Sequence, residues 1–207
     1  MKIEGEYTFD GVRELVWEVV RDPEVLATAL PGTQSLEKIS ENEYEGEMHV
    51  RIGPVAGLFS GKVLISDEVA PESLTMTVEG KGKPGFLTGT GAIKLIPQDS
   101  GKTLMQYQGD MQVGGRLASV GQRMMDSVSK SLLNQGLDSL NQALLARQAS
   151  RESGEEVEYR PPSESEFAAS VARDMAGEVF SSRWTIWLAI AVVIVIIVLA
   201  IVILNRG

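Results

Sequence analysis

Residues that could perform acid–base, nucleophilic or metal chemistry are sparse in this sequence. His49 is the only histidine, and the 207 residues contain no cysteine. The lack of cysteine excludes disulfides, thiolate catalysis, thiolate-bound zinc and cysteine-held iron–sulfur clusters. His49 lies between Glu47 and Arg51 on the polar side of an alternating segment, a position typical of a solvated residue. Because no nucleophile-elbow motif or metal-ligand spacing accompanies His49, we expect neither a catalytic nor a metal site.

A glycine-rich segment, Gly80-Lys-Gly-Lys-Pro-Gly85, resembles a phosphate-binding loop at first sight. It lacks the Gly-Lys-Ser/Thr ending of such loops, and the residues after it alternate as in a strand rather than a helix. The segment therefore predicts a β-turn.

Methionine and aromatic side chains offer a different kind of site, an apolar cavity. Unbranched thioethers adapt to varied apolar shapes and suit a flat ring with a prenyl tail. Simple core filling is the alternative for these residues. The candidate cavity residues are Phe59, Phe86, Leu87, Met105, Tyr107, Met111, Leu117, Met124, Met125, Val128 and Leu132.

The elements that would hold these residues begin with alternating segments. Residues 2–9 alternate as a half-buried strand, Asp10 is expected to cap a short helix, and Pro23 to open a second one. Further alternating segments separated by turn residues predict an antiparallel meander. These segments cover residues 34–40, 43–52, 58–69, 74–78, 86–96 and 103–113.

From Leu117 to about Arg147 the apolar residues recur every three or four positions, which predicts one long amphipathic helix. Gly136 within it is expected to mark a bend or a close approach. The fold class is therefore α+β: a curved antiparallel sheet that wraps around a long C-terminal helix, the helix-grip arrangement, over residues 1–147. Sheet and helix would enclose a cavity.

The rest of the chain predicts a membrane anchor. Residues 148–183 form a polar linker with an amphipathic helix over about 164–182, and residues 184–204 contain no charge, Gly or Pro. As a helix this last segment is about 31 Å long, enough to cross the hydrocarbon core of a bilayer. Trp184 and Trp187 suit the headgroup level.

The formal net charge of -9 argues against binding to nucleic acid or anionic lipid. Attachment to the cell membrane would therefore depend on the single C-terminal span. Because the first residues lack the apolar core of a signal peptide, we expect the main domain to be cytoplasmic.

Four stretches resemble the CoxG family of carbon monoxide dehydrogenase subunits, part of the START-like, polyketide-cyclase-type (SRPBCC) superfamily, over about residues 1–135. They are Leu30-Pro-Gly-Thr-Gln-Ser-Leu-Glu37, Gly53-Pro-Val-Ala-Gly-Leu-Phe-Ser-Gly61, Gly80-Lys-Gly82 and Val113-Gly-Gly-Arg-Leu-Ala-Ser-Val-Gly-Gln-Arg123. The chain departs from the family at Gly136-Leu137, where a Phe-Phe pair is typical. The smaller side chains would leave more space on the inner side of the helix.

The resemblance implies a helix-grip domain without enzymatic residues, which associates with a molybdenum hydroxylase of the carbon monoxide dehydrogenase type. It also implies attachment of that enzyme to the membrane and binding of an apolar molecule such as a quinone. Two hypotheses follow. The domain is either a tethered carrier that shuttles the apolar molecule between bilayer and enzyme, or a structural adaptor with a filled core. A hydrolase or cyclase is the weakest reading, for lack of an acid–base constellation.

Overall fold

The computed structural model describes residues 1–153. The predicted juxtamembrane helix (164–182), the predicted transmembrane helix (184–204) and the linker beyond residue 153 lie outside the described residues. Among residues 1–153, no helix combines the length and the apolar character needed to cross a bilayer.

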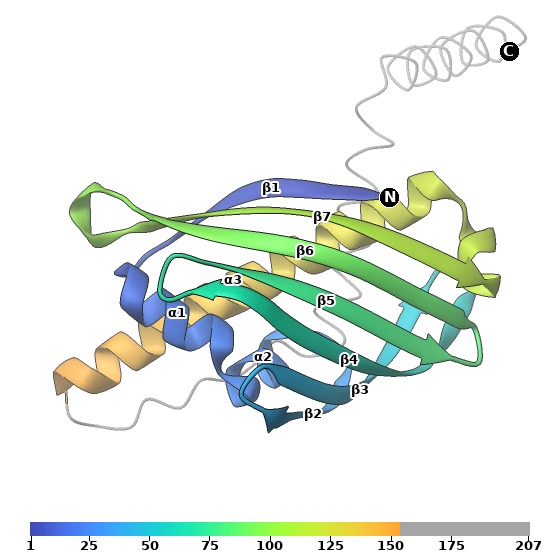
Figure 1. Cartoon of the computed structure of the whole chain (residues 1–207), viewed down its shortest axis with the longest axis horizontal. Coiled ribbons are helices and arrows are strands. Elements are labelled where there is room, and N and C mark those ends of the chain that lie inside the picture. Colours follow the sequence, from blue (N-terminus) through green and yellow to red (C-terminus); the bar gives the residue numbers. More distant parts are fainter. Residues whose placement is uncertain (154–207) are drawn as a thin grey trace, which may run out of the picture. The chain divides into compact units, whose positions relative to one another are not determined.

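One antiparallel sheet of seven strands dominates residues 1–153 (Figure 1). Its order is β1-β7-β6-β5-β4-β3-β2, so β2 to β7 form a meander and β1 pairs with the last strand. This confirms the predicted curved antiparallel sheet. The strands are β1 (Lys2–Phe9), β2 (Thr33–Ser40), β3 (Glu43–Ile52), β4 (Val55–Val69), β5 (Ser73–Gly82), β6 (Gly85–Pro97) and β7 (Thr103–Gly115).

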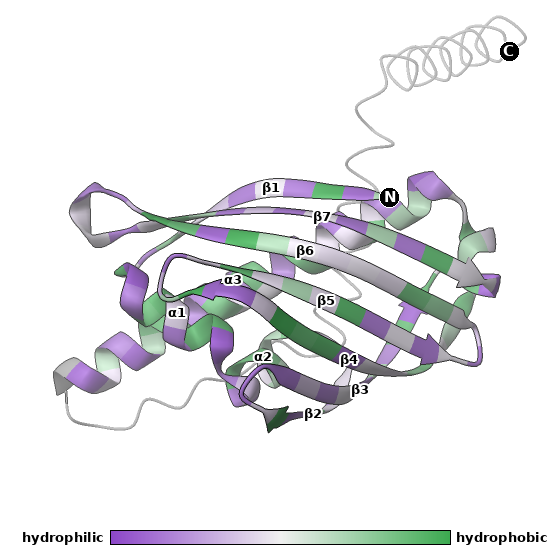
Figure 2. Cartoon of the chain, viewed as in Figure 1, coloured by the Kyte–Doolittle hydropathy of each residue, from purple (hydrophilic) through white to green (hydrophobic). Residues whose placement is uncertain are grey.

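Alternation along the strands separates an inner from an outer face of the sheet. On β3, Tyr44 and Ile52 are buried whereas Glu45 and Arg51 are exposed, and on β4 Phe59 is buried. Figure 2 shows the same alternation as bands of hydrophobic and hydrophilic residues along the ribbons. Because successive side chains of a strand point to opposite faces, the apolar set lies on the side of the helices.

Helix α1 (Arg13–Arg21) begins without the cap expected from the sequence. Its N-cap position is Val12, which provides no side-chain hydrogen bond. Asp10 instead accepts hydrogen bonds from Lys102 Nζ at 2.7 Å and Asn141 Nδ2 at 2.9 Å. The prediction for Asp10 was therefore wrong: its carboxylate joins the first strand to the β6–β7 turn and the long helix.

Helix α2 (Pro23–Ala29) begins with Pro23, as predicted. Asp22 is its N-cap, and one carboxylate oxygen accepts from the backbone N–H groups of Glu24 at 3.0 Å and Val25 at 3.4 Å. Such a cap satisfies donors that have no partner inside the helix. The short helix is thus anchored at its first turn.

The long helix α3 spans Gln122–Ser153, so its predicted limits were wrong at both ends. Residues Arg116–Val120 form a 3-10 turn (η2), and Gly121 follows with φ +91°. Because a residue in an α-helix has φ near about −60°, the α-helix can begin only after Gly121. At its other end it continues six residues beyond Arg147 into the predicted linker. A second 3-10 turn (η1) covers Asp99–Gly101.

Helix α3 packs on α1, α2 and the inner face of the sheet. The largest core cluster joins Phe9, Val16 and Leu95 with Leu140 and Leu144 of α3. A second cluster lies at the start of α3, and a third lies between β3, β4 and β5. The sheet and the helix therefore share a core, which confirms the helix-grip layout.

Candidate ligand-binding cavity

An apolar cavity of about 350 Å³ lies on the inner face of the sheet, beneath β3, β4 and β5. Helices α1 and α2, with the residue that follows α2, contribute Val20, Leu26 and Leu30 to its lining. The remaining lining comes from strands β2 to β6. These residues are Thr33, Ser35, Leu36, Tyr44, Gly46, Glu47, Met48, Val50, Phe59, Gly61, Lys62, Val63, Ile65, Met76, Val78, Glu79, Gly80 and Leu87.

The two inward hydroxyl groups of the cavity already have protein partners. Tyr44 Oη donates to the backbone oxygen of Arg21 at 3.0 Å, and Thr33 Oγ1 donates to that of Leu30 at 2.7 Å. Each hydroxyl oxygen keeps lone pairs that can still accept a hydrogen bond. The cavity is thus suited to an apolar molecule with few polar atoms.

Two of the predicted cavity residues, Phe59 and Leu87, line this cavity. Two further methionines, Met48 and Met76, line it as well. Ligand binding by any of these residues stays a prediction.

Most of the other predicted residues are brought together elsewhere in the core. Leu117, Met125 and Val128 are buried with Phe59, and Met124 and Leu132 pack against them. Met105 is buried in the largest cluster, with Tyr107 packed against it, and Met111 is half-buried on the inward face of β7. Apart from Phe59, none of these side chains lines the 350 Å³ cavity, and all but Met111 belong to the core clusters around it. Alternation predicts the face of a side chain but not which neighbour covers it.

Phe86 lies on the outer face of the sheet and is 49% exposed, so the expectation that it points into the apolar cavity was wrong. Its ring covers Gly114 on the neighbouring strand, where a Cβ would collide with the ring edge. Leu87, the next residue, points inward. The turn before Gly85 hides the phase of the strand in the sequence, so both residues were candidates for the cavity.

Sequence reasoning missed the lining residues of α2, β2, β3 and β5 and, on β4, all but Phe59. Leu26 and Leu30 face the cavity from the short helix and its end, and Leu36, Val63 and Val78 face it from the strands. A signal for the strand residues was present, because all three are inward members of alternating segments. The contribution of α2 depends on how that helix packs, which no local pattern encodes.

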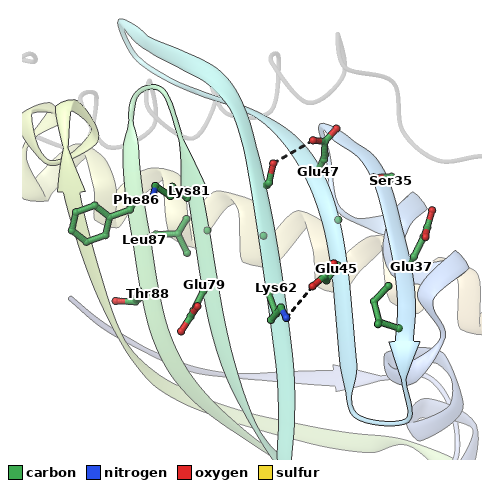
Figure 3. A pocket seen from close by; sticks show the side chains of 15 residues that line it. Ser35, Glu37, Glu45, Glu47, Lys62, Glu79, Lys81, Phe86, Leu87 and Thr88 are labelled. Atoms are coloured by element: carbon green, nitrogen blue, oxygen red, sulfur yellow. Dashed lines mark hydrogen bonds and ion pairs between the residues drawn. The ribbon is translucent and has the colours of Figure 1, made fainter.

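A shallow groove of about 610 Å³ lies on the opposite, outer face of the sheet (Figure 3). Most of its fifteen lining residues are exposed, and six of them are charged. Lys62 Nζ pairs with Glu45 at 2.9 Å and also with Glu43. The hydrogen bond to Glu43, and after it the one to Glu45, raises the pKa of the Lys62 ammonium group. Ser60 Oγ donates to Glu47 at 3.2 Å. Such paired surface charges are typical of a solvated face.

In residues 1–153 no histidine lines the cavity and no metal-binding cluster occurs. His49 is exposed on the outer face of β3, as predicted, and no three His, Asp or Glu side chains of this part gather where they could hold a metal ion. Tyr7 Oη donates to Asp138 Oδ1 at 2.8 Å, and burial together with this bond raises the pKa of Tyr7. The protonated Tyr7 hydroxyl group thus links β1 to α3 and has a structural role.

A sheet wrapped around one long helix, with a cavity between the sheet and the short helices α1 and α2, defines a START-like helix-grip protein. A START superfamily protein from Mycobacterium smegmatis has a TM-score of 0.54 at 13% identity, covering 70% of this chain and 97% of that one. Zhui aromatase/cyclase from Streptomyces sp. R1128 has a TM-score of 0.53 at 14% identity, covering 72% and 95%. At these identities the likeness shows the fold alone.

The profile of the CoxG family of carbon monoxide dehydrogenase subunits matches residues 5–145. The chain therefore belongs to the CoxG family. A conserved protein from Geobacillus kaustophilus is 30% identical, with a TM-score of 0.67 over 70% of this chain and 95% of that chain. No functionally curated protein matches. Family and fold together indicate a ligand-binding accessory protein.

Proposed function

We propose that this protein is a membrane-tethered accessory protein of a carbon monoxide dehydrogenase-type molybdenum hydroxylase. Its helix-grip domain binds an apolar lipid such as a quinone and carries it between the bilayer and the enzyme. The observation that carries the proposal is the apolar cavity of about 350 Å³, which side chains leave unfilled. A packed core contains few voids larger than a water molecule.

Two features outside the cavity support the tether and the partner. The uncharged segment 184–204 is long enough to anchor the domain in a membrane, and the main domain would then stay on the cytoplasmic side. The partner enzyme follows from the name of the family. A polar linker of about 30 residues reaches roughly 30 Å if it is flexible, a distance suited to a shuttle between the bilayer and a docked enzyme.

The second candidate function is a structural adaptor that recruits the enzyme to the membrane without any ligand. The observation that favours it is the packing of Met105, Met125 and Val128 into the core, which leaves only part of the interior open. Tethering alone raises the effective concentration of a partner. The two candidates differ in what the cavity contains.

The test is to purify the full chain from membranes and to identify lipids in its solvent extract by mass spectrometry. Val63→Phe would fill the cavity, and Leu64→Phe is a matched control because Leu64 lies next to it on the outer face, 48% exposed. The carrier predicts a stoichiometric apolar lipid in the wild type and in Leu64→Phe but not in Val63→Phe. An extract without such a lipid, together with no uptake of added quinone, would leave the adaptor as the function.

A further inference from the structure

Exposed basic side chains gather at one end of the domain, although the formal net charge of the chain is -9. This end contains the β3–β4 turn, the β5–β6 turn and the segment that leads from β7 through η2 into α3 (Figure 1). Residues 50–57, 80–87 and 113–125, which form it, carry five cations and no carboxylate. We call this end the basic tip, and its exposed cations are Arg51, Lys81, Lys83, Arg116 and Arg123.

Contacts between the three segments hold these cations on one surface. The backbone N–H of Leu117 in η2 donates to the oxygen of Pro84 at 3.0 Å, which places Arg116 beside the β5–β6 turn. A Cβ at Gly53 would meet the sulfur of Met124, so the β3–β4 turn lies against the first turn of α3. The basic tip is therefore one continuous surface rather than three separate loops.

The charges at the two ends of α3 are arranged differently. None of the five cations of the basic tip forms an ion pair within residues 1–153. At the opposite end, α1, the β4–β5 turn and the β6–β7 turn meet the last turns of α3, and cations there are paired with carboxylates. These pairs are Arg13–Glu72, Arg21–Glu68, Lys102–Asp10, Arg147–Asp22 and Arg151–Glu18.

Folding does not explain the arrangement at the basic tip. Arg123 is the second residue of α3, and the first turn of this helix contains no acidic residue. A helix N-terminus carries the positive end of the helix dipole, so a cation there lowers stability, as does the repulsion between neighbouring cations. A negatively charged partner would remove both penalties.

Small apolar side chains lie among the cations of the basic tip. Pro54, Ala56 and Ala118 are exposed, and Val55 and Val120 are half-buried. At the surface of a bilayer, cations meet the phosphates of anionic lipids while apolar side chains enter the boundary between headgroups and acyl chains. The composition of the basic tip suits such a surface.

The proposed anchor, residues 184–204, keeps the domain close to a bilayer. Helix α3 has 32 residues and is about 48 Å long, and the chain leaves the domain at the end opposite the basic tip. The roughly 30 residues from 154 to 183 span up to about 100 Å when fully extended, so their length allows the tip to reach the bilayer. Because charges more than about 8 Å apart are screened from each other by physiological salt, the acidic end does not cancel the attraction at the tip.

We infer that the basic tip is a docking surface for the anionic headgroups of a lipid bilayer. The domain meets the bilayer with this end, and its acidic end points away. Salt weakens such a contact, so the contact orients the domain and does not replace the anchor. The inference uses the anchor of the proposed function only to bring the domain near a bilayer, and it does not depend on what the cavity binds.

The test measures, by flotation, how the full chain in phosphatidylcholine nanodiscs binds to separate lipid vesicles. The vesicles contain phosphatidylcholine alone or with about 30% phosphatidylglycerol, and empty nanodiscs provide the blank. Lys83→Gln/Arg116→Gln removes two cations from the basic tip. Lys38→Gln/Lys94→Gln is the matched control, because it changes the net charge equally at two exposed lysines on β2 and β6, outside the tip, that form no ion pair within residues 1–153.

The wild type should bind the anionic vesicles and not the neutral ones, and about 0.5 M sodium chloride should abolish binding. The tip variant should bind at least about tenfold more weakly, and the control variant should change binding by less than about twofold. Equal losses in both variants, or equal binding to neutral vesicles, would overturn the inference. A wild type that does not bind anionic vesicles would also overturn it and would leave an acidic protein surface as the partner of the basic tip.

A second measurement tests the orientation without charge variants. Because the chain contains no cysteine, a single cysteine can carry a polarity-sensitive dye. Ala118→Cys places the dye on η2 at the basic tip, and Gln98→Cys places it in the exposed β6–β7 turn at the opposite end. In the full chain reconstituted into anionic vesicles, the emission should shift to shorter wavelength at position 118 only, and salt should reverse the shift. Equal emission changes at both positions, or none at position 118, would overturn the docking surface.

Discussion

Arg147 of α3 donates from Nη2 to the Asp22 carboxylate at 2.6 Å. Asp22 is also the N-cap of α2, the short helix that places Leu26 and Leu30 over the cavity. The long helix thus holds the cover of the cavity through one ion pair. Both side chains are partly shielded, 32% and 24% exposed, so solvent screens this pair less than a pair on the open surface.

Loss of this ion pair should loosen α2. For Arg147→Ala we expect a loss of about 1 kcal/mol in unfolding free energy, because the partly shielded Asp22 carboxylate loses its cationic partner. We also expect faster release of a bound naphthoquinone, measured by stopped-flow dilution into lipid vesicles. Arg151→Ala is the control, since the pair of Arg151 with Glu18 is 58% and 48% exposed. Equal release rates for both variants would show that α2 does not cover the ligand.

Asp10 should make stability depend on acid pH. The Lys102 ammonium group, followed by the Asn141 amide, lowers the pKa of Asp10 below its ordinary value of 3.8. A lowered folded-state pKa stabilises the protein above the unfolded-state pKa, and this contribution disappears as pH falls through the folded-state value. Because this carboxylate is 41% exposed and solvent screens its pair with Lys102, Asp10→Asn should cost only about 0.5 kcal/mol at pH 7 and progressively less below about pH 4.

Urea unfolding of the full chain in detergent at pH 7 and pH 3 measures this difference. Asp110→Asn is the control, because Asp110 is exposed on the outer face of β7 and should change stability little at either pH. A penalty for Asp10→Asn that is equal at both pH values would contradict the assigned ionic role of Asp10.

Gly136 should be replaceable by alanine with a gain in stability. A Cβ at this position would lie 3.4 Å from Leu30 Cδ2, an ordinary contact. Because alanine favours a helix interior over glycine, Gly136→Ala should raise the unfolding free energy by about 0.5–1 kcal/mol. Gly136→Phe should instead push Leu30 away and lower the thermal midpoint. A destabilised alanine variant would show that α2 approaches α3 more closely than this distance allows.

Deletion of residues 184–207 should release the protein from membranes. The uncharged segment 184–204 provides the proposed anchor, and the net charge of -9 argues against attachment through anionic lipid. Fractionation of cells that express the full chain or the truncated chain measures the effect. A truncated chain that still sediments with membranes after a high-salt wash would contradict the proposed anchor.

The fold could be predicted from the sequence because its signals are local and repeated. Alternation placed the strands, the turn at Gly53-Pro54 separated β3 from β4, and the three- to four-residue spacing identified the long helix. The start of that helix was misplaced because Leu117 fits the apolar period although Gly121 interrupts the helix backbone with its positive φ.

The cavity was harder to predict, because its lining depends on long-range packing. Met105, Met125 and Phe59 all face inward, yet only Phe59 lines the open space, since the other two are covered by neighbouring core residues. Leu30 reaches the cavity from the end of α2, where it lies against Gly136 of α3. Contacts between segments far apart in the chain produce no periodic pattern of apolar residues in the sequence.

The most direct test of the carrier function is to locate a bound quinone by photolabelling. The full chain in nanodiscs that contain a photoreactive naphthoquinone would be irradiated, digested and mapped by mass spectrometry. The cavity predicts labels on Met48, Val63 and Met76, and competition by unlabelled naphthoquinone should remove them. Labels confined to residues 184–204 or to Phe86 on the outer face would contradict the assignment of the cavity as the ligand site.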